Sequence, residues 1–163
     1  MEMERLADLQ ARHAGAGRLE WIGLRPARRE PLLAVETADV CDAGLEGDHA
    51  GAGRRAVTLI QSEHLPVIAA LAKLHDVAPE MLRRNLVVSG LNLIALRNRR
   101  IAIGDVVLSI TAPCPPCSRM EQALGAGGYT AMRGHGGVYA EVVRVGTLRL
   151  GDCVRPDGDE DAG

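Results

Sequence analysis

The chain has 163 residues, a formal net charge of −2 and a pI of about 6.2. This length suits one domain with a real core and is short for two. The charge balance gives no support for a general nucleic-acid or anionic-membrane binder, and a single tryptophan with no phenylalanine leaves few side chains for base stacking.

In chain order, residues 1–17 form an N-terminal segment with a short helix, residues 18–156 form one compact domain, and residues 157–163 form an acidic tail that we expect to be disordered. Short apolar runs punctuated by glycine outnumber helical ones and predict a β-rich chain. The predicted strands are 19–24, 32–40, 56–60, 86–88, 100–103, 106–110, 138–145 and 152–155.

Three further segments are predicted to be helical. The first spans 62–74 with Ser62 as its N-cap, the second spans 79–84 and opens on a proline, and the third spans 119–124. His64, on the first helix, is predicted to be a surface residue. Gly104-Asp105 and Gly151-Asp152 each predict a tight turn that feeds a hairpin.

The fold class expected from these elements is α+β and mostly β: a closed or nearly closed barrel with a few helices packed outside. A doubly wound parallel sheet is the weaker alternative. It would need strands alternating regularly with crossover helices, and the chain shows little of that after Arg84.

The sequence also indicates a compartment. No basic start followed by an apolar stretch occurs at the N-terminus, and no segment has the length needed to cross a bilayer, so we expect a cytoplasmic protein. In that reducing environment the cysteines are expected to be thiols rather than a disulfide framework. The four cysteines are Cys41, Cys114, Cys117 and Cys153.

Cys117 is the most informative of them. An apolar, β-branched run ends just before it, and Pro115-Pro116 blocks backward extension of the helix that follows. Cys117 is therefore predicted at or beside a helix N-terminus, where backbone N–H groups and Arg119 favour the thiolate that attacks sulfur or binds a soft metal. The alternative is a buried structural cysteine.

Cys114 and Cys117 together have the Cys-x-x-Cys spacing of dithiol oxidoreductases. A structural zinc site needs four ligands, which Cys41 or Cys153 with His135 would have to complete. The spacing gives little support for zinc.

Two glycine-rich stretches and one arginine pair carry further polar candidates. Gly44-Leu45-Glu46-Gly47-Asp48-His49 leads to Arg54 and Arg55, where glycines let a ligand approach the backbone and arginines supply fixed positive charge. An ordinary turn with solvated arginines is an equally good interpretation. Arg83-Arg84-Asn85 ends the second predicted helix and enters a predicted strand, and a purely structural role for one of the two arginines is at least as good an interpretation, because cations are favoured at a helix C-terminus. His135 lies between glycines, where it is expected to line a pocket or face solvent.

Taken together, the 44–49 motif, Arg84-Asn85, Pro116-Cys117, Gly136-Gly137 and Gly151-Asp152 resemble the MOSC domain family, named for the C-terminal domain of molybdenum cofactor sulfurases. The resemblance runs from about residue 18 to residue 155 and implies a stand-alone member with a β-barrel fold. It also implies that Cys117 is the family cysteine, which carries sulfur as a persulfide or coordinates the molybdenum of a pterin cofactor.

The resemblance implies partners for the pterin's phosphate and ring edges. The candidates are Arg54, Arg55, Arg84, Asn85, Arg119, His135, His49 and Asp48. Cys114 departs from the commoner family pattern, and it could resolve a persulfide on Cys117 as a disulfide. Pyridoxal phosphate, which the parent sulfurases use in another domain, could form a Schiff base only on Lys73 and is not expected here.

The function expected from these observations is a molybdenum-cofactor-associated sulfur carrier or small oxidoreductase, such as an N-oxide or N-hydroxyl reductase or a sulfurtransferase-like protein. Its expected partners are the pterin cofactor or a sulfur donor or acceptor protein, with no nucleic acid and no membrane. Two alternatives stay open: a non-catalytic module that binds an anion or a protein and has structural thiols, and a dithiol reductase that uses Cys114 and Cys117.

Overall fold

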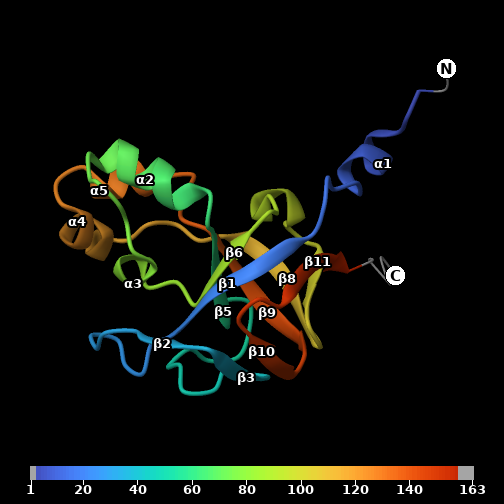
Figure 1. Cartoon of the computed structure of the whole chain (residues 1–163), viewed down its shortest axis with the longest axis horizontal. Helices are drawn as coiled ribbons and strands as arrows, with labels where there is room; N and C mark the ends of the chain where they lie inside the picture. The colour runs from blue at the N-terminus through green and yellow to red at the C-terminus, as the bar shows by residue number, and fades with distance from the viewer. Residues whose placement is uncertain (1–2, 158–163) are drawn as a thin grey trace.

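The structure is a computed structural model that describes residues 3–157, and its centre is a seven-stranded closed barrel (Figure 1). The strands follow the order β11-β7-β8-β9-β5-β6-β1, and β1 pairs with β11 to close the ring. They are β1 (Gly17–Leu24), β5 (Val57–Gln61), β6 (Leu86–Ser89), β7 (Arg100–Ile103), β8 (Val106–Pro113), β9 (Val138–Arg144) and β11 (Cys153–Asp157). Among the strands of residues 3–157, only β5 and β6 pair in parallel. The closed ring confirms the predicted barrel.

A smaller sheet packs against the barrel. It contains β10 (Gly146–Arg149), β3 (Thr37–Cys41) and β4 (Gly44–Leu45), whose buried residues join the barrel core, while β2 (Leu33–Val35) extends the large sheet beside β1. The single strand predicted over 32–40 is thus two strands in different sheets, and β4 and β10 were not predicted. The Gly104 turn forms the β7–β8 hairpin, but the Gly151 turn leads from the small sheet into the barrel and makes no hairpin.

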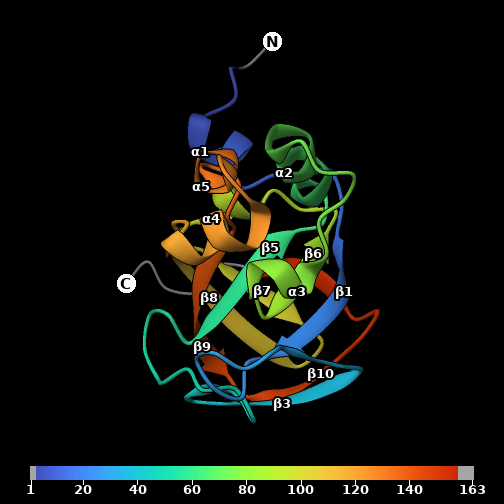
Figure 2. The ribbon, with the colours of Figure 1, turned by 90° about the vertical axis from the view of Figure 1, so that its left-hand side faces the viewer.

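The helices are α1 (Leu6–Gln10), α2 (His64–Ala72), α3 (Pro79–Leu82), the 3₁₀ helix η1 (Leu93–Leu96), α4 (Ser118–Leu124) and α5 (Gly128–Met132). Helices α2 to α5 gather on one side of the barrel, whereas α1 projects away from it and buries no residue (Figures 1 and 2). The N-cap of α2 is Glu63, because the Ser62 N–H donates to the Val88 carbonyl and belongs to the strand side of the junction. None of the helices within residues 3–157 is long and apolar enough to span a bilayer. Of the predicted acidic tail, Asp157 belongs to β11, and 158–163 lie outside the described residues.

Two hydrophobic clusters position the site. One fills the barrel, and the other joins α2, α3, α4 and α5 to the outer face of β5 and β6. Strand β5 is buried on both faces because its side chains alternate, with Leu59 in the barrel cluster and Ile60 against the helices. Met120 in the first turn of α4 also belongs to the helical cluster. Its packing fixes the start of α4 beside the ends of the central strands.

Candidate functional site

Cys117 is the N-cap of α4 and is exposed. It lines a cleft of about 270 Å³ that we name the arginine cleft. The cleft is lined by Arg25, Arg28, His49, Arg83, Arg84, Cys117, Arg119 and Met120. These residues come from the loop after β1, the loop after β4, the junction of α3 with β6, and the start of α4.

Arg84 has a buried donor that the protein leaves unused. The residue is only 7% exposed, its Nε donates to the Gly136 carbonyl at 2.8 Å, and its Nη1 donates to the Leu82 carbonyl at 3.0 Å. Within residues 3–157 its Nη2 has no hydrogen-bond partner. A buried guanidinium N–H without an acceptor is costly, so an acceptor that reaches this nitrogen would stabilise the site.

The cleft carries more positive charge than its own acids neutralise. Of its five arginines, only Arg25 forms an ion pair among the described residues, with Asp48. Burial lowers the pKa of Arg83 below its usual range, and the neighbouring charges of Arg119 and Arg25 lower it further. Closely spaced guanidinium groups that repel one another make a favourable place for an anion.

Carbonyl groups hold several of these arginines in place. Arg83 donates to the carbonyls of Ala27 and Glu30, and Arg119 donates to the carbonyl of Arg28. The loop after β1 is thereby tied to α3 and α4. The positions of the guanidinium groups are therefore set by backbone contacts, without neutralisation of their charge.

Asp48 and Asn85 form a buried network beside the cleft. Asp48 accepts hydrogen bonds from the Arg25 backbone, the Arg25 guanidinium and the Ala50 backbone. The fully buried Asn85 donates to Asp48 Oδ1 and to the Gly23 carbonyl, both at 3.0 Å. Both hydrogens of the Asn85 amide are thus engaged within the protein, and the network holds Arg25 at the cleft wall.

The pKa of Asp48 reflects this environment. Burial alone would raise it, but hydrogen bonds from the side chain and backbone of Arg25, with the charge of Arg25, outweigh burial and lower the pKa below its ordinary value near 3.8. Asp48 is therefore a carboxylate at neutral pH, committed to Arg25.

The predicted site residues do not all meet. Arg84, Arg119, His49 and Cys117 line the cleft, and Asp48 with Asn85 lies next to it. The other three predicted ligand contacts, Arg54, Arg55 and His135, do not line it.

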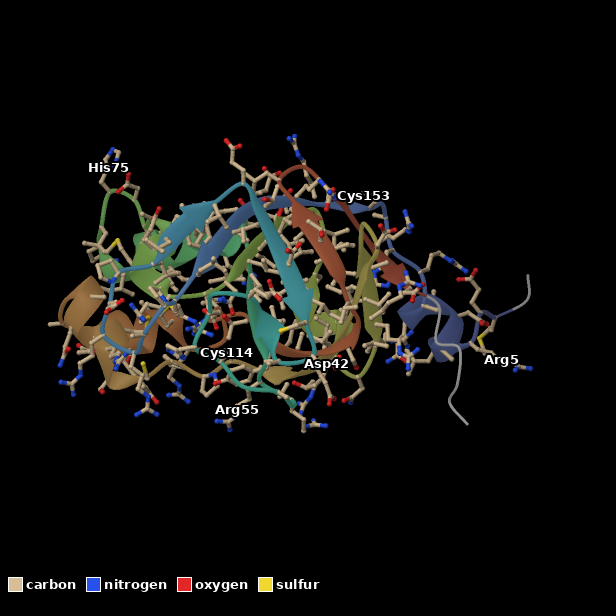
Figure 3. All side chains as sticks on the ribbon, turned by 90° about the horizontal axis from the view of Figure 1, so that it is seen from below. Arg5, Asp42, Arg55, His75, Cys114 and Cys153 are labelled. Carbon is tan, nitrogen blue, oxygen red and sulfur yellow. The ribbon has the colours of Figure 1, made fainter. Side chains whose placement is uncertain are left out.

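The three side chains outside the cleft make contacts elsewhere. The His135 ring meets the His64 ring edge to face. Arg54 donates to the Thr111 carbonyl at 3.4 Å, and Arg55 lies 5.2 Å from the centre of the Tyr139 ring. Figure 3 shows Arg55 at the edge of the molecule, pointing outward.

Three cleft arginines escaped the sequence analysis as ligand candidates: Arg25, Arg28 and Arg83. Arg25 and Arg28 come directly after the first barrel strand, and Arg83 precedes Arg84 at the end of a helix. The available signal was the repeated placement of arginines at the ends of elements. Their convergence depends on tertiary packing.

Cys114 lies on the other side of the Cys-Pro-Pro-Cys segment. It is buried, and with Pro115 and Pro116 it lines a separate cavity of about 560 Å³, which we name the apolar cavity. Its N–H donates to the Gly137 carbonyl at 2.8 Å, and Gly137 is needed there because at φ +88° an added Cβ would overlap the Leu59 carbonyl. The two cysteine residues of the motif therefore line different cavities.

The structure gives little support for a disulfide framework, a structural zinc site or a Schiff base on Lys73. All four cysteines lie within residues 3–157 and are free thiols, and Cys153 and Cys114 occupy different sides of the barrel (Figure 3). Within the same residues no three His, Cys, Asp or Glu side chains group as metal ligands would. Lys73 is an exposed residue at the end of α2 and does not line the arginine cleft.

Comparison with known proteins places the chain in a family. The sequence profile of the MOSC domain matches residues 46–155, which is more than half of the chain. Among solved structures, the YuaD protein of Bacillus subtilis aligns with a TM-score of 0.77 and 21% identity, covering 86% of this chain and 94% of its own.

Two YiiM structures also share the fold. YiiM of Geobacillus stearothermophilus aligns with a TM-score of 0.72 and 15% identity over 87% of this chain and 75% of its own. YiiM of Escherichia coli aligns with a TM-score of 0.68 and 19% identity over 86% of this chain and 70% of its own. The search among curated proteins gave no match. On the strength of the profile match and of the barrel that carries Cys117, this chain belongs to the MOSC domain family.

Proposed function

We propose that this protein is a molybdenum-cofactor-associated sulfur carrier or small oxidoreductase that works through Cys117. The observation that carries the proposal is an exposed thiol on a cleft with five arginines, one of which has a buried donor without a partner. The MOSC family is associated with molybdenum cofactor binding or sulfur transfer, and both uses suit a soft sulfur ligand beside fixed positive charge.

The chain's own groups fit a pterin cofactor with a phosphate. Arg84 Nη2 would donate to a phosphate oxygen, and Arg83 and Arg119 would add charge without a large rearrangement, because backbone carbonyls already hold them. Cys117 would bind the metal through its thiolate. When bound, the molybdenum centre would supply two-electron redox chemistry.

Sulfur transfer would use the same thiol. The Cys117 thiolate would attack the sulfane sulfur of a donor persulfide, forming a new S–S bond at Cys117 and releasing the donor as a thiolate. Cys117 would then carry the sulfur as an anionic persulfide. The neighbouring guanidinium groups stabilise that negative charge, and the open cleft lets a donor or acceptor protein reach it.

One purification tests both uses. The wild type, Cys117→Ala and Cys153→Ala are expressed in a host that makes the cofactor, and molybdenum, pterin fluorescence and cyanide-labile sulfur are measured. Cys153 is the matched control because it is also exposed but lies on β11, outside the cleft. We expect wild type and Cys153→Ala to carry cofactor or sulfane sulfur and Cys117→Ala to carry neither. Equal and negligible amounts in all three, with no uptake of sulfane sulfur from a persulfide donor, would refute the proposal.

The arginines also favour a second candidate, a non-catalytic anion-binding module. It predicts that Cys117→Ala binds pyrophosphate as wild type does, that wild-type Cys117 neither accepts sulfur nor retains molybdenum, and that the thiol is inert to alkylation. Titration calorimetry with pyrophosphate, beside the sulfur and metal assays, separates the two candidates.

A further inference from the structure

The apolar cavity has the dimensions of a second ligand site. Its volume of about 560 Å³ lies in the range of small-molecule pockets, roughly 300–1,000 Å³. Leu93, Ile94, Pro113 and Val138 supply apolar wall. The segment 114–117 separates it from the arginine cleft, since its first three residues line this cavity and its last lines the cleft.

Gln61 offers this cavity a directed hydrogen bond. The residue is only 8% exposed, at the end of β5, and its Oε1 accepts the Leu93 N–H at 2.8 Å. Among the hydrogen bonds of residues 3–157 there is none from its amide nitrogen Nε2, and Gln61 lines the cavity. A primary amide that uses its acceptor on the backbone and keeps its donors free selects a ligand with an acceptor.

The remaining polar wall carries little charge. His64 is half-buried, lines the cavity and meets His135 edge to face with ring centres 5.3 Å apart. Burial lowers the pKa of His64, the charge of His135 lowers it further, and Glu63 opposes this effect, so His64 is neutral at pH 7. Arg133 is the one formally charged residue of the lining and is itself exposed.

We propose that the apolar cavity binds an uncharged, largely apolar small molecule that places a hydrogen-bond acceptor on the Gln61 amide. An anion is better served by the arginine cleft, whereas a neutral ligand loses little solvation on entering this cavity. Cys114 also lines this cavity. The inference is independent of the proposed function, because it uses neither Cys117 nor the arginines.

The probe for the test is Prodan, an uncharged naphthalene with one ketone acceptor whose emission shifts to the blue in apolar surroundings. We expect saturable binding to the full chain. Gln61→Glu keeps an acceptor for the Leu93 N–H but replaces the free donor with a carboxylate oxygen, so affinity should fall about tenfold. Ile94→Trp, at a cavity residue that is 47% exposed, should block the space and reduce affinity at least as much. Cys117→Ala is the control and should bind Prodan as wild type does.

Thiol labelling locates the probe. Prodan should slow the reaction of Cys114 with uncharged monobromobimane and leave Cys117 unaffected, as resolved by peptide mass spectrometry. Pyrophosphate should do the opposite, which keeps failure of this inference distinct from failure of the proposed function. Unsaturable binding, wild-type affinity in both Gln61→Glu and Ile94→Trp, or protection of Cys117 instead of Cys114 would each overturn the proposal.

Discussion

Asn85→Ala is the sharpest test of how the cleft is built. The Asn85 side chain is fully buried and joins three segments: its Oδ1 accepts from the N–H and hydroxyl of Thr58, and its Nδ2 donates to the Gly23 carbonyl and to Asp48. Alanine removes all of these bonds at once. The buried partners cannot recover them from water, because Thr58 is also buried.

The size of the effect follows from these bonds. The bonds to Thr58 and to Gly23 are neutral and contribute about 1 kcal/mol each, while the bond to the carboxylate of Asp48 contributes about 1.5–3 kcal/mol. We therefore expect the free energy of unfolding to fall by about 4 kcal/mol. That is a large part of the roughly 5–15 kcal/mol typical of a domain.

Urea unfolding followed by fluorescence measures this loss. Trp21 is the only tryptophan and packs against the helical cluster, so its emission reports on the folded core. Cys117→Ala is the comparison and should change the unfolding free energy by no more than about 0.5 kcal/mol, because its side chain is exposed. If Asn85→Ala lost less than about 1 kcal/mol but failed to bind pyrophosphate, Asn85 would be a ligand contact instead of a positioning residue.

Three further predictions address the charges of the site. The pKa of Asp48 is lower in the folded state than in the unfolded state, so its contribution to stability is complete above the unfolded-state pKa and is lost as the pH falls through the folded-state pKa. Between pH 7 and pH 3, the urea midpoint of Asp48→Asn should therefore fall less steeply than that of wild type. Arg84→Lys should reduce the rise in Tm caused by pyrophosphate, since an ammonium group cannot place a donor where Nη2 lies; an unchanged rise would show that Arg84 does not contact the anion. The ratio of the alkylation rate with anionic iodoacetate to the rate with neutral iodoacetamide should be several-fold higher for Cys117 than for Cys153, and this difference should shrink at 1 M salt. Equal ratios for the two cysteines would show that the arginines do not act on the Cys117 thiol.

Local patterns in the sequence predicted much of the fold. Alternating and continuous apolar runs placed seven barrel strands, and the proline pair placed Cys117 at the start of α4. These features depend on neighbours within a few residues. The run 32–40 shows the limit, because Glu36 interrupts it where the chain passes from one sheet to another, and hydropathy does not record such a change of partner.

The site was predictable only in part. Arg25 and Arg83 are 58 positions apart in the sequence and meet because β1 and β6 are neighbouring strands whose ends face α4. Arg55, by contrast, precedes a strand in a glycine-rich stretch and looked like an anion contact, yet it lies over the Tyr139 ring. Residue type and loop composition indicate which side chains are available for a site. Strand pairing decides which of them meet.

The positions of the two thiols in the Cys-Pro-Pro-Cys segment bear on how long a persulfide would last. Cys114 is held by its N–H bond to the Gly137 carbonyl, and the Cys117 carbonyl accepts from the Met120 N–H in the first turn of α4. A disulfide needs the two sulfur atoms about 2 Å apart. The two residues are free cysteines that line different cavities, so closure would require the segment to change its conformation. We therefore expect sulfane sulfur on Cys117 to be lost at the same rate in wild type and in Cys114→Ser, followed by cyanolysis in the absence of an acceptor thiol. Markedly slower loss in Cys114→Ser, with a Cys114–Cys117 disulfide in the wild type, would show instead that Cys114 resolves the persulfide and that the segment moves.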